Sequence, residues 1–171
     1  CFLLSCTQDV SITKVNEVYP ENIEIIKVAE YLANLKAKAF TNISCDTIVI
    51  TADTVVILNE EILGKPKNKT EAIKMLQSLS NRNHKVMTGV CIKSKEKTIS
   101  FSNTTKVFFK KLTSSEINYY VENYKPFDKA GSYGIQEWIG AIGITKIDGS
   151  YFNVVGLPIN TLYKNLKEYF F

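Results

Sequence analysis

The most constraining feature of this sequence is one carboxylate inside an apolar strand. The segment ITADTVVILNEEILGKP, residues 50–66, places Asp53 just before the apolar run 55–58. Such a run favours a buried strand, and an isolated carboxylate is costly to bury. Two interpretations stay open from the strand alone. Asp53 binds backbone amides at a strand bulge, or it is an acid in a cleft that binds a divalent metal or activates a water.

The segments around this strand alternate between helical and extended patterns. Helices are expected at 28–40, 70–79, after Thr113 and at 157–169, and strands at 46–59, 85–93, 97–112 and 142–147. Thr70 is the predicted N-cap of the second helix, and Thr113 with Glu116 matches a capping box. Hairpins among helices predict an α/β fold with a mixed, curved sheet and flanking helices. A length of 171 residues suits a single domain, 1–171, with two lobes.

Charge and composition argue against several classes of function. The net charge is +4, but its lysines are scattered and Arg82 is the only arginine, so no nucleic-acid partner is expected. No run of eighteen apolar residues is present, and no membrane partner is expected. The four cysteines and the single histidine, His84, lack the spacing of a zinc site. We expect reduced thiols in a cytoplasmic protein.

Four further segments carry candidate site residues. Lys65 in "GKP" either points at a phosphate or is a solvated turn lysine. "FDKAGSYGIQ", residues 127–136, is either a tight connection or a loop in which Gln136 meets the edge of a nucleobase and Tyr133 packs on a sugar or base. Glu17 and Lys36 are surface charges or contribute to a metal–phosphate site. "GSYFNVVGLP", residues 149–158, is interpreted as scaffold.

Taken together and in order, these motifs resemble the Maf family of nucleoside triphosphate pyrophosphatases, also described as septum formation inhibitors. The resemblance rests on "ADTVV", "GKP", "MLQSLSNRNHKVMTGV", "DKAGSYGIQ" and "GSYFNVVGLP", and runs from about Glu17 to the end. It implies an α/β fold shared with inosine triphosphate pyrophosphatases, with two lobes around a cleft. "AGSYGIQ" is similar to the subfamily acting on dTTP and UTP.

The resemblance also implies a reaction and a set of site residues. The reaction is hydrolysis of dTTP or UTP to the monophosphate and pyrophosphate by a nucleotide diphosphatase, with Mg²⁺ or Mn²⁺ and in a homodimer. Asp53 is the implied catalytic residue and, with Glu17, a metal ligand. The implied substrate-binding residues are Glu17, Lys36, Thr54, Lys65 and Gln136.

One departure from the family pattern leads to an alternative. The family opens with a Ser-x-Ser-Pro-Arg-Arg loop that grips the triphosphate, and this sequence has no such motif, so we expect a domain truncated at its N-terminus relative to the family. The early acid motif also differs, with Asn16 at an acidic position and Val18 at that of a small hydroxyl residue. The alternative is a catalytically impaired nucleotide-binding or regulatory protein of the same fold.

Overall fold

The protein is an elongated α/β structure built on one long sheet. The computed structural model describes residue 15 and residues 17–170. The strands are β1 (Val49–Leu58), β2 (Glu61–Leu63), β3 (Asn83–Lys93), β4 (Thr98–Phe109) and β5 (Ile144–Asp148). The helices are α1 (Ile25–Lys38), α2 (Lys69–Leu79), α3 (Ser114–Tyr124), η1 (Ala130–Ser132), α4 (Trp138–Gly143), α5 (Tyr151–Val155) and α6 (Ile159–Tyr169). Within the described residues, no helix is long and apolar enough to span a membrane.

The sheet has five strands in the order β2-β1-β3-β4-β5. All pairings between the described strands are antiparallel, where we expected a mixed sheet. The reason is the connections: β1–β2 and β3–β4 are hairpins, the connection through α2 places β3 antiparallel beside β1, and the connection from β4 returns β5 antiparallel beside β4. The α/β fold class itself is confirmed.

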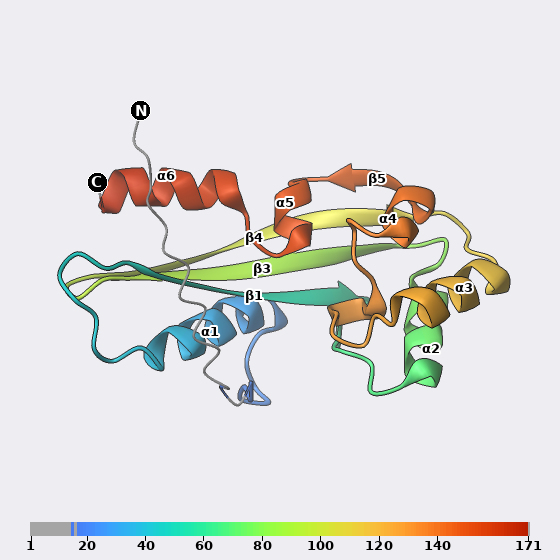
Figure 1. Ribbon diagram of the computed structural model, residues 1–171, viewed down its shortest axis with the longest axis horizontal. Coiled ribbons are helices and arrows are strands. Elements are labelled where there is room, and N and C mark those ends of the chain that lie inside the picture. The colour runs from blue at the N-terminus through green and yellow to red at the C-terminus, as the bar shows by residue number, and fades with distance from the viewer. Residues whose placement is uncertain (1–14, 16, 171) are drawn as a thin grey trace.

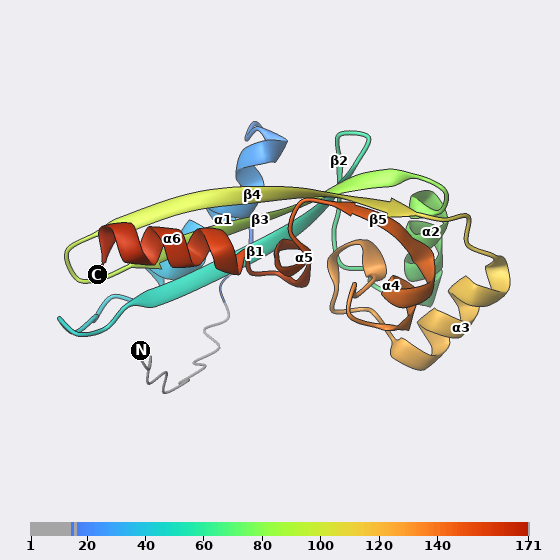
Figure 2. The same ribbon diagram turned by 90° about the horizontal axis from the view of Figure 1, so that it is seen from above.

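Two lobes lie at opposite ends of the long strands (Figure 1). The first contains α1 and α6, and the second contains α2, α3, η1 and α4, as the view from above also shows (Figure 2). Alternate residues of β1 serve the two faces of the sheet, as strand geometry requires. Val55 and Ile57 pack with α1, whereas Val56 and Leu58 join the core built with α2, α3 and α4.

A glycine on β3 allows α1 to lie unusually close to the sheet. A Cβ atom added to Gly89 would stand 2.3 Å from the backbone carbon of Ala29, in the middle of α1. No side chain fits there, so glycine is required for this close approach rather than for its backbone flexibility. Gly89 pairs with Asp53 across the β1–β3 ladder, so the same contact sets how α1 lies over the candidate acid.

The start of α3 was predicted correctly, whereas the N-cap of α2 lies two residues earlier than predicted. Thr113 and Glu116 form the predicted capping box, with the Glu116 amide donating to Thr113 Oγ1 at 3.2 Å. The N-cap of α2 is Asn68 rather than Thr70: Asn68 Oδ1 accepts from the Glu71 amide at 3.0 Å. Asparagine caps at least as well as threonine, so Asn68 starts the helix earlier.

Tyr133 is 6% exposed and belongs to the core, and the expectation that it packs on a nucleotide stays a prediction. Its hydroxyl and His84 Nε2 are 2.7 Å apart, and its ring meets that of Phe109 edge-on at 5.1 Å. His84 is itself 2% exposed and stacks on Phe109. The only histidine of the chain is therefore a structural group, and burial lowers its pKa from 6.5 to about 4.

We predict that His84 makes the fold less stable in mild acid. Below pH 6.5 the unfolded chain binds a proton at this side chain, whereas the folded protein does not until about pH 4. Stability is therefore complete above pH 6.5 and is lost as the pH falls, by about 2 kcal/mol between pH 7 and pH 5. Urea unfolding at pH 7 and pH 5 measures this difference in the free energy of unfolding. His84→Gln should flatten the dependence, and an equal slope in both proteins would contradict the assignment.

Candidate active site

A cleft of about 280 Å³ lies at the edge of β1, between the two lobes. β2 pairs only with Val56–Leu58, so within the described part of the chain the earlier half of β1 has no strand on that side. The lining residues come from α1, β1, β3, the loop after β2, the segment around η1, and α5. They are Lys36, Ala52, Asp53, Thr54, Val56, Lys65, Val86, Asp128, Lys129, Ala130, Tyr133, Gly134, Ile135, Gln136, Val154 and Val155.

Two consecutive residues of β1 give this cleft two different walls. Asp53 lies on the α1 face of the sheet, where Lys36 reaches it. Thr54 lies on the opposite face, where its hydroxyl meets Thr88 on β3 at 2.8 Å. Because successive side chains of a strand point to opposite faces, the cleft passes around the strand edge. The sheet thereby separates the wall formed by Lys36 and Asp53, here called the charged wall, from the wall formed by Thr54, Val56 and Val86, here called the uncharged wall. Asp128 and Lys129 line the cleft from the segment before η1.

Lys36 joins the two candidate carboxylates. Its Nζ hydrogen bonds to Asp53 Oδ1 and lies 3.0 Å from Glu17 Oε1. The Asp53 side chain is 12% exposed, compared with 43% for Glu17. The β1–β3 register is regular at Asp53, so the alternative of a structural Asp at a strand bulge does not fit. The cost of burying this carboxylate is offset by a cation instead.

The two carboxylates differ in their affinity for protons. Burial raises the pKa of Asp53 above its usual value, even though Lys36 opposes the shift. The pKa of Glu17 is lowered, because its hydrogen bond to Lys36 outweighs its slight burial. Burial acts to lower the pKa of Lys36, but its two carboxylate partners outweigh burial and raise it. Of the two acids, Asp53 is therefore the stronger proton acceptor.

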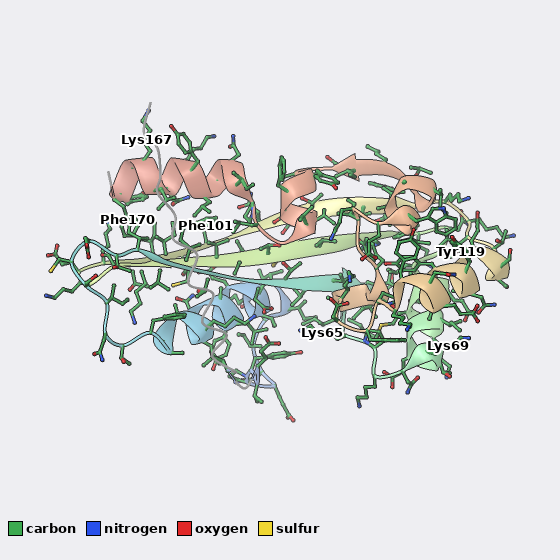
Figure 3. All side chains as sticks on the ribbon, viewed as in Figure 1. Lys65, Lys69, Phe101, Tyr119, Lys167 and Phe170 are labelled. Atoms are coloured by element: carbon green, nitrogen blue, oxygen red, sulfur yellow. The ribbon has the colours of Figure 1, made fainter. Side chains whose placement is uncertain are left out.

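Lys65 reaches the cleft from the loop between β2 and α2. Figure 3 shows it on this loop, and it lines the cleft together with Lys36 of α1 and Ala130 of η1. The preceding Gly64 accepts a hydrogen bond from the Gly131 amide at 3.1 Å, which ties the loop to η1. Lys65 is exposed, and its positive charge acts on both Asp53 and Glu17. Its position suits an anion held in front of the carboxylates.

The segment that carries Gln136 is anchored from behind. The Tyr120 hydroxyl of α3 hydrogen bonds to the Glu137 carboxylate and accepts from the Gly134 amide at 3.0 Å. Gln136 itself is exposed at the rim of the cleft. An anchored backbone with an exposed amide suits a ligand that needs both a donor and an acceptor.

The contacts of three residues near the cleft were not predicted from the sequence. Lys129 lines the cleft and bridges Asp128 at 2.8 Å and Glu137 at 3.2 Å. Thr88 and Asn153 form the fully buried support of Thr54. Lys129 resembles any loop lysine in the sequence, and the other two contacts join residues 34 and 65 positions apart. No local pattern signals such contacts.

A divalent cation fits the donors present, provided that the substrate supplies the rest. Asp53 and Glu17 offer the hard oxygen ligands that Mg²⁺ and Mn²⁺ prefer. Within the described residues, no cluster of three or more acidic, histidine or cysteine side chains exists to hold a metal alone. Mg²⁺ commonly binds through one or two carboxylates together with phosphate oxygens and water. Lys36 now joins the two carboxylates, so a cation shared by both would compete with Lys36.

The sequence model of the family described as Maf-like protein matches residues 3–169. The chain belongs to the Maf family. The match confirms the resemblance and extends it toward the N-terminus from Glu17, where our motifs began. The segment before residue 15, on which we based the expected truncation, lies outside the described residues.

Relatives within the family are similar along almost the whole chain. A protein of Christiangramia forsetii named dTTP/UTP pyrophosphatase is 50% identical over 160 residues, covering 93% of this chain and 82% of its own length. The protein of that name from Flavobacterium psychrophilum is 49% identical over 164 residues, covering 95% and 84%. That of Porphyromonas gingivalis is 49% identical over 158 residues, covering 91% and 79%.

We predict that the pKa of Asp53 is higher in the Lys36→Met variant than in the wild type. Lys36 favours the charged form of Asp53 through a hydrogen bond and its positive charge, and methionine removes both while keeping a similar side-chain length. The measurement is an NMR titration of the Asp53 carboxyl carbon. Lys38→Met, an exposed position on the same helix, serves as control and should leave the titration unchanged. An unchanged or lower Asp53 pKa in Lys36→Met would contradict the pairing.

Proposed function

We propose that this protein hydrolyses dTTP and UTP to the nucleoside monophosphate and pyrophosphate. The observation that carries the proposal is the cleft lined by Asp53, Lys36 and Lys65, with Glu17 paired to Lys36, in a chain about half identical to proteins named dTTP/UTP pyrophosphatase. The cleft joins a proton acceptor, cations for phosphates and uncharged polar groups for a base. This combination favours the enzyme over the catalytically impaired alternative.

In the proposed reaction a water attacks the α-phosphorus while Asp53 accepts its proton. The bond from the α-phosphorus to the bridging oxygen breaks, and pyrophosphate leaves with the bonding electron pair. Lys65, and Lys36 once it turns from a carboxylate, neutralise the charge that develops on the leaving group. Burial supports the role of Asp53, because it raises the proton affinity of this carboxylate above that of Glu17.

Asp53 and Glu17 would hold the divalent cation. When bound, the cation offsets the repulsion between carboxylates and triphosphate and polarises the phosphate. With the cation held there, Lys36 would be available to the phosphates. Lys36 already contacts both carboxylates, so this arrangement would need no other side chain.

Base choice is assigned to the uncharged wall. Thr54 and Gln136 line the cleft, and the glutamine amide can both donate to a carbonyl and accept from a ring N–H. The thymine and uracil edge offers this pairing. The cytoplasmic location and the homodimer remain predictions.

Asp53→Asn should lower pyrophosphate release from dTTP with Mg²⁺ by about 10²–10⁴-fold, the usual contribution of a general base. Asparagine keeps the size of the side chain but cannot accept the proton. Asp46→Asn, at an exposed position before β1, is the matched control and should keep full activity. Near-normal turnover by Asp53→Asn, with an unchanged circular dichroism spectrum, would end this assignment.

Gln136→Ala should reduce the preference for dTTP and UTP over CTP and GTP by about tenfold, because one or two hydrogen bonds to the base are lost. The measurement is kcat/KM for the four nucleotides. Gln77→Ala makes the same change at an exposed position of α2 and should keep the wild-type ranking. Gln136 has no part in base choice if its variant also keeps that ranking, or if the wild type prefers GTP.

A further inference from the structure

A hydrogen-bonded chain behind the uncharged wall connects α5 to Thr54. The hydroxyl oxygens of Thr54 and Thr88 are 2.8 Å apart, and the Thr88 hydroxyl donates to the backbone carbonyl of Asn153 at 2.8 Å. Thr88 and Asn153 are both 0% exposed, so water does not compete for these bonds. Only Thr54, which is half-buried, reaches the cleft.

The number of hydroxyl hydrogens determines which group is the donor and which is the acceptor in each of these hydrogen bonds. A threonine hydroxyl has one hydrogen to donate, and a carbonyl oxygen can only accept. The Thr88 hydrogen is therefore committed to Asn153. In its contact with Thr88, Thr54 must be the donor. The Thr54 oxygen has no hydrogen left for the cleft, and it presents only lone pairs there.

Exchanging donor and acceptor between Thr54 and Thr88 is unfavourable because of the groups that hold Asn153 in place. If Thr88 donated to Thr54, two oxygens would face each other at 2.8 Å with no hydrogen between them. Asn153 cannot move away, because its side-chain amide donates to the Val86 carbonyl at 3.1 Å and to Thr105 Oγ1 at 3.0 Å. The Asn153 carbonyl would keep its hydrogen bond from the Gly156 amide at 3.2 Å, but the two facing oxygens would repel each other.

We propose that Thr88 is a positioning residue that makes Thr54 a fixed hydrogen-bond acceptor for the nucleobase. The inference rests on the proposed function and adds the basis of its base choice. The charged groups Lys36 and Asp53 occupy the other face of the strand, so the base belongs on the wall of Thr54. Thymine and uracil carry a ring N–H at N3 that Thr54 can accept, which leaves the Gln136 amide to donate to a neighbouring ring carbonyl. Cytosine has a lone pair at N3, which a fixed acceptor repels.

The test compares kcat/KM for dTTP and dCTP in the wild type, Thr88→Val and Thr88→Ser. Valine removes the acceptor for Thr54, so the Thr54 hydroxyl can turn and donate to cytosine, and the dTTP preference should fall about tenfold. Serine keeps the hydroxyl and should keep the preference. A purely structural role of Thr88 would lower kcat/KM for both nucleotides by the same factor. An unchanged ratio in a folded Thr88→Val protein overturns the inference.

A second variant covers the case in which Thr88→Val does not fold. Thr54→Ala removes the acceptor itself, and it should lower kcat/KM for dTTP while raising it for dCTP, because the repulsion of cytosine N3 is gone. A hydroxyl free to rotate would serve both bases, so its removal would lower both values. That second result overturns the inference as well.

The outcomes also separate this inference from the proposed function. If the wild type prefers dTTP but Thr88→Val and Thr54→Ala keep the wild-type ratio of kcat/KM for dTTP and dCTP, the function stands and the role of Thr88 fails. If the wild type releases pyrophosphate from neither nucleotide, the proposed function fails. Thermal shifts with dTTP and dCTP then decide the inference, and an equal shift with both, or none with either, overturns it.

Discussion

The arrangement of this protein depends on one ion pair at the edge of a strand. The carboxylate of Asp53 is nearly buried, and Lys36 is the cation that compensates it. Removing one partner of such a pair leaves an uncompensated charge in a medium that solvates it poorly. Lys36 is close enough because α1 lies directly on Gly89, and Lys93 of β3 holds the end of this helix by donating to the Phe40 carbonyl at 2.7 Å. The electrostatics of the site are thus built into the packing of one helix.

The cleft also separates two kinds of recognition. Lys36, Lys65 and the two carboxylates form a strongly charged region that suits a triphosphate with its cation. Thr54 lies on the other side of the sheet edge, among Val56, Val86 and other uncharged groups. A charge near the base would favour binding of any polar partner, whereas neutral groups with fixed hydrogen-bond directions discriminate between bases. In the proposed function, placing Asp53 and Lys36 on the opposite face from Thr54 keeps these two charges away from the base.

Local patterns predicted much of this structure, and long-range contacts account for the rest. The capping box at Thr113 and the apolar run after Asp53 are short-range signals, and both predicted the correct element. Asn68 and Thr70 compete as caps within three residues, and propensity alone does not choose between them. Tyr133 looked like a ligand contact because it lies in a glycine-containing loop, but His84, 49 residues away, takes its hydroxyl into the core. The prediction that Asp53, Lys65 and Gln136 share one site came from the order of the motifs along the chain, which resembles that of the Maf family. The spacing of single residues does not predict this site.

The placement of Asp53 and Thr54 on opposite faces of β1 has a consequence for how such proteins diverge. The two residues are joined by one peptide bond, yet their side chains point to opposite faces of the sheet and contact different partners. Under the proposed function, a substitution at Thr54 would change base choice while leaving the Asp53–Lys36 ion pair in place. New nucleotide preferences would then arise by single mutations on one face of the strand, while the ion pair on the other face is inherited unchanged.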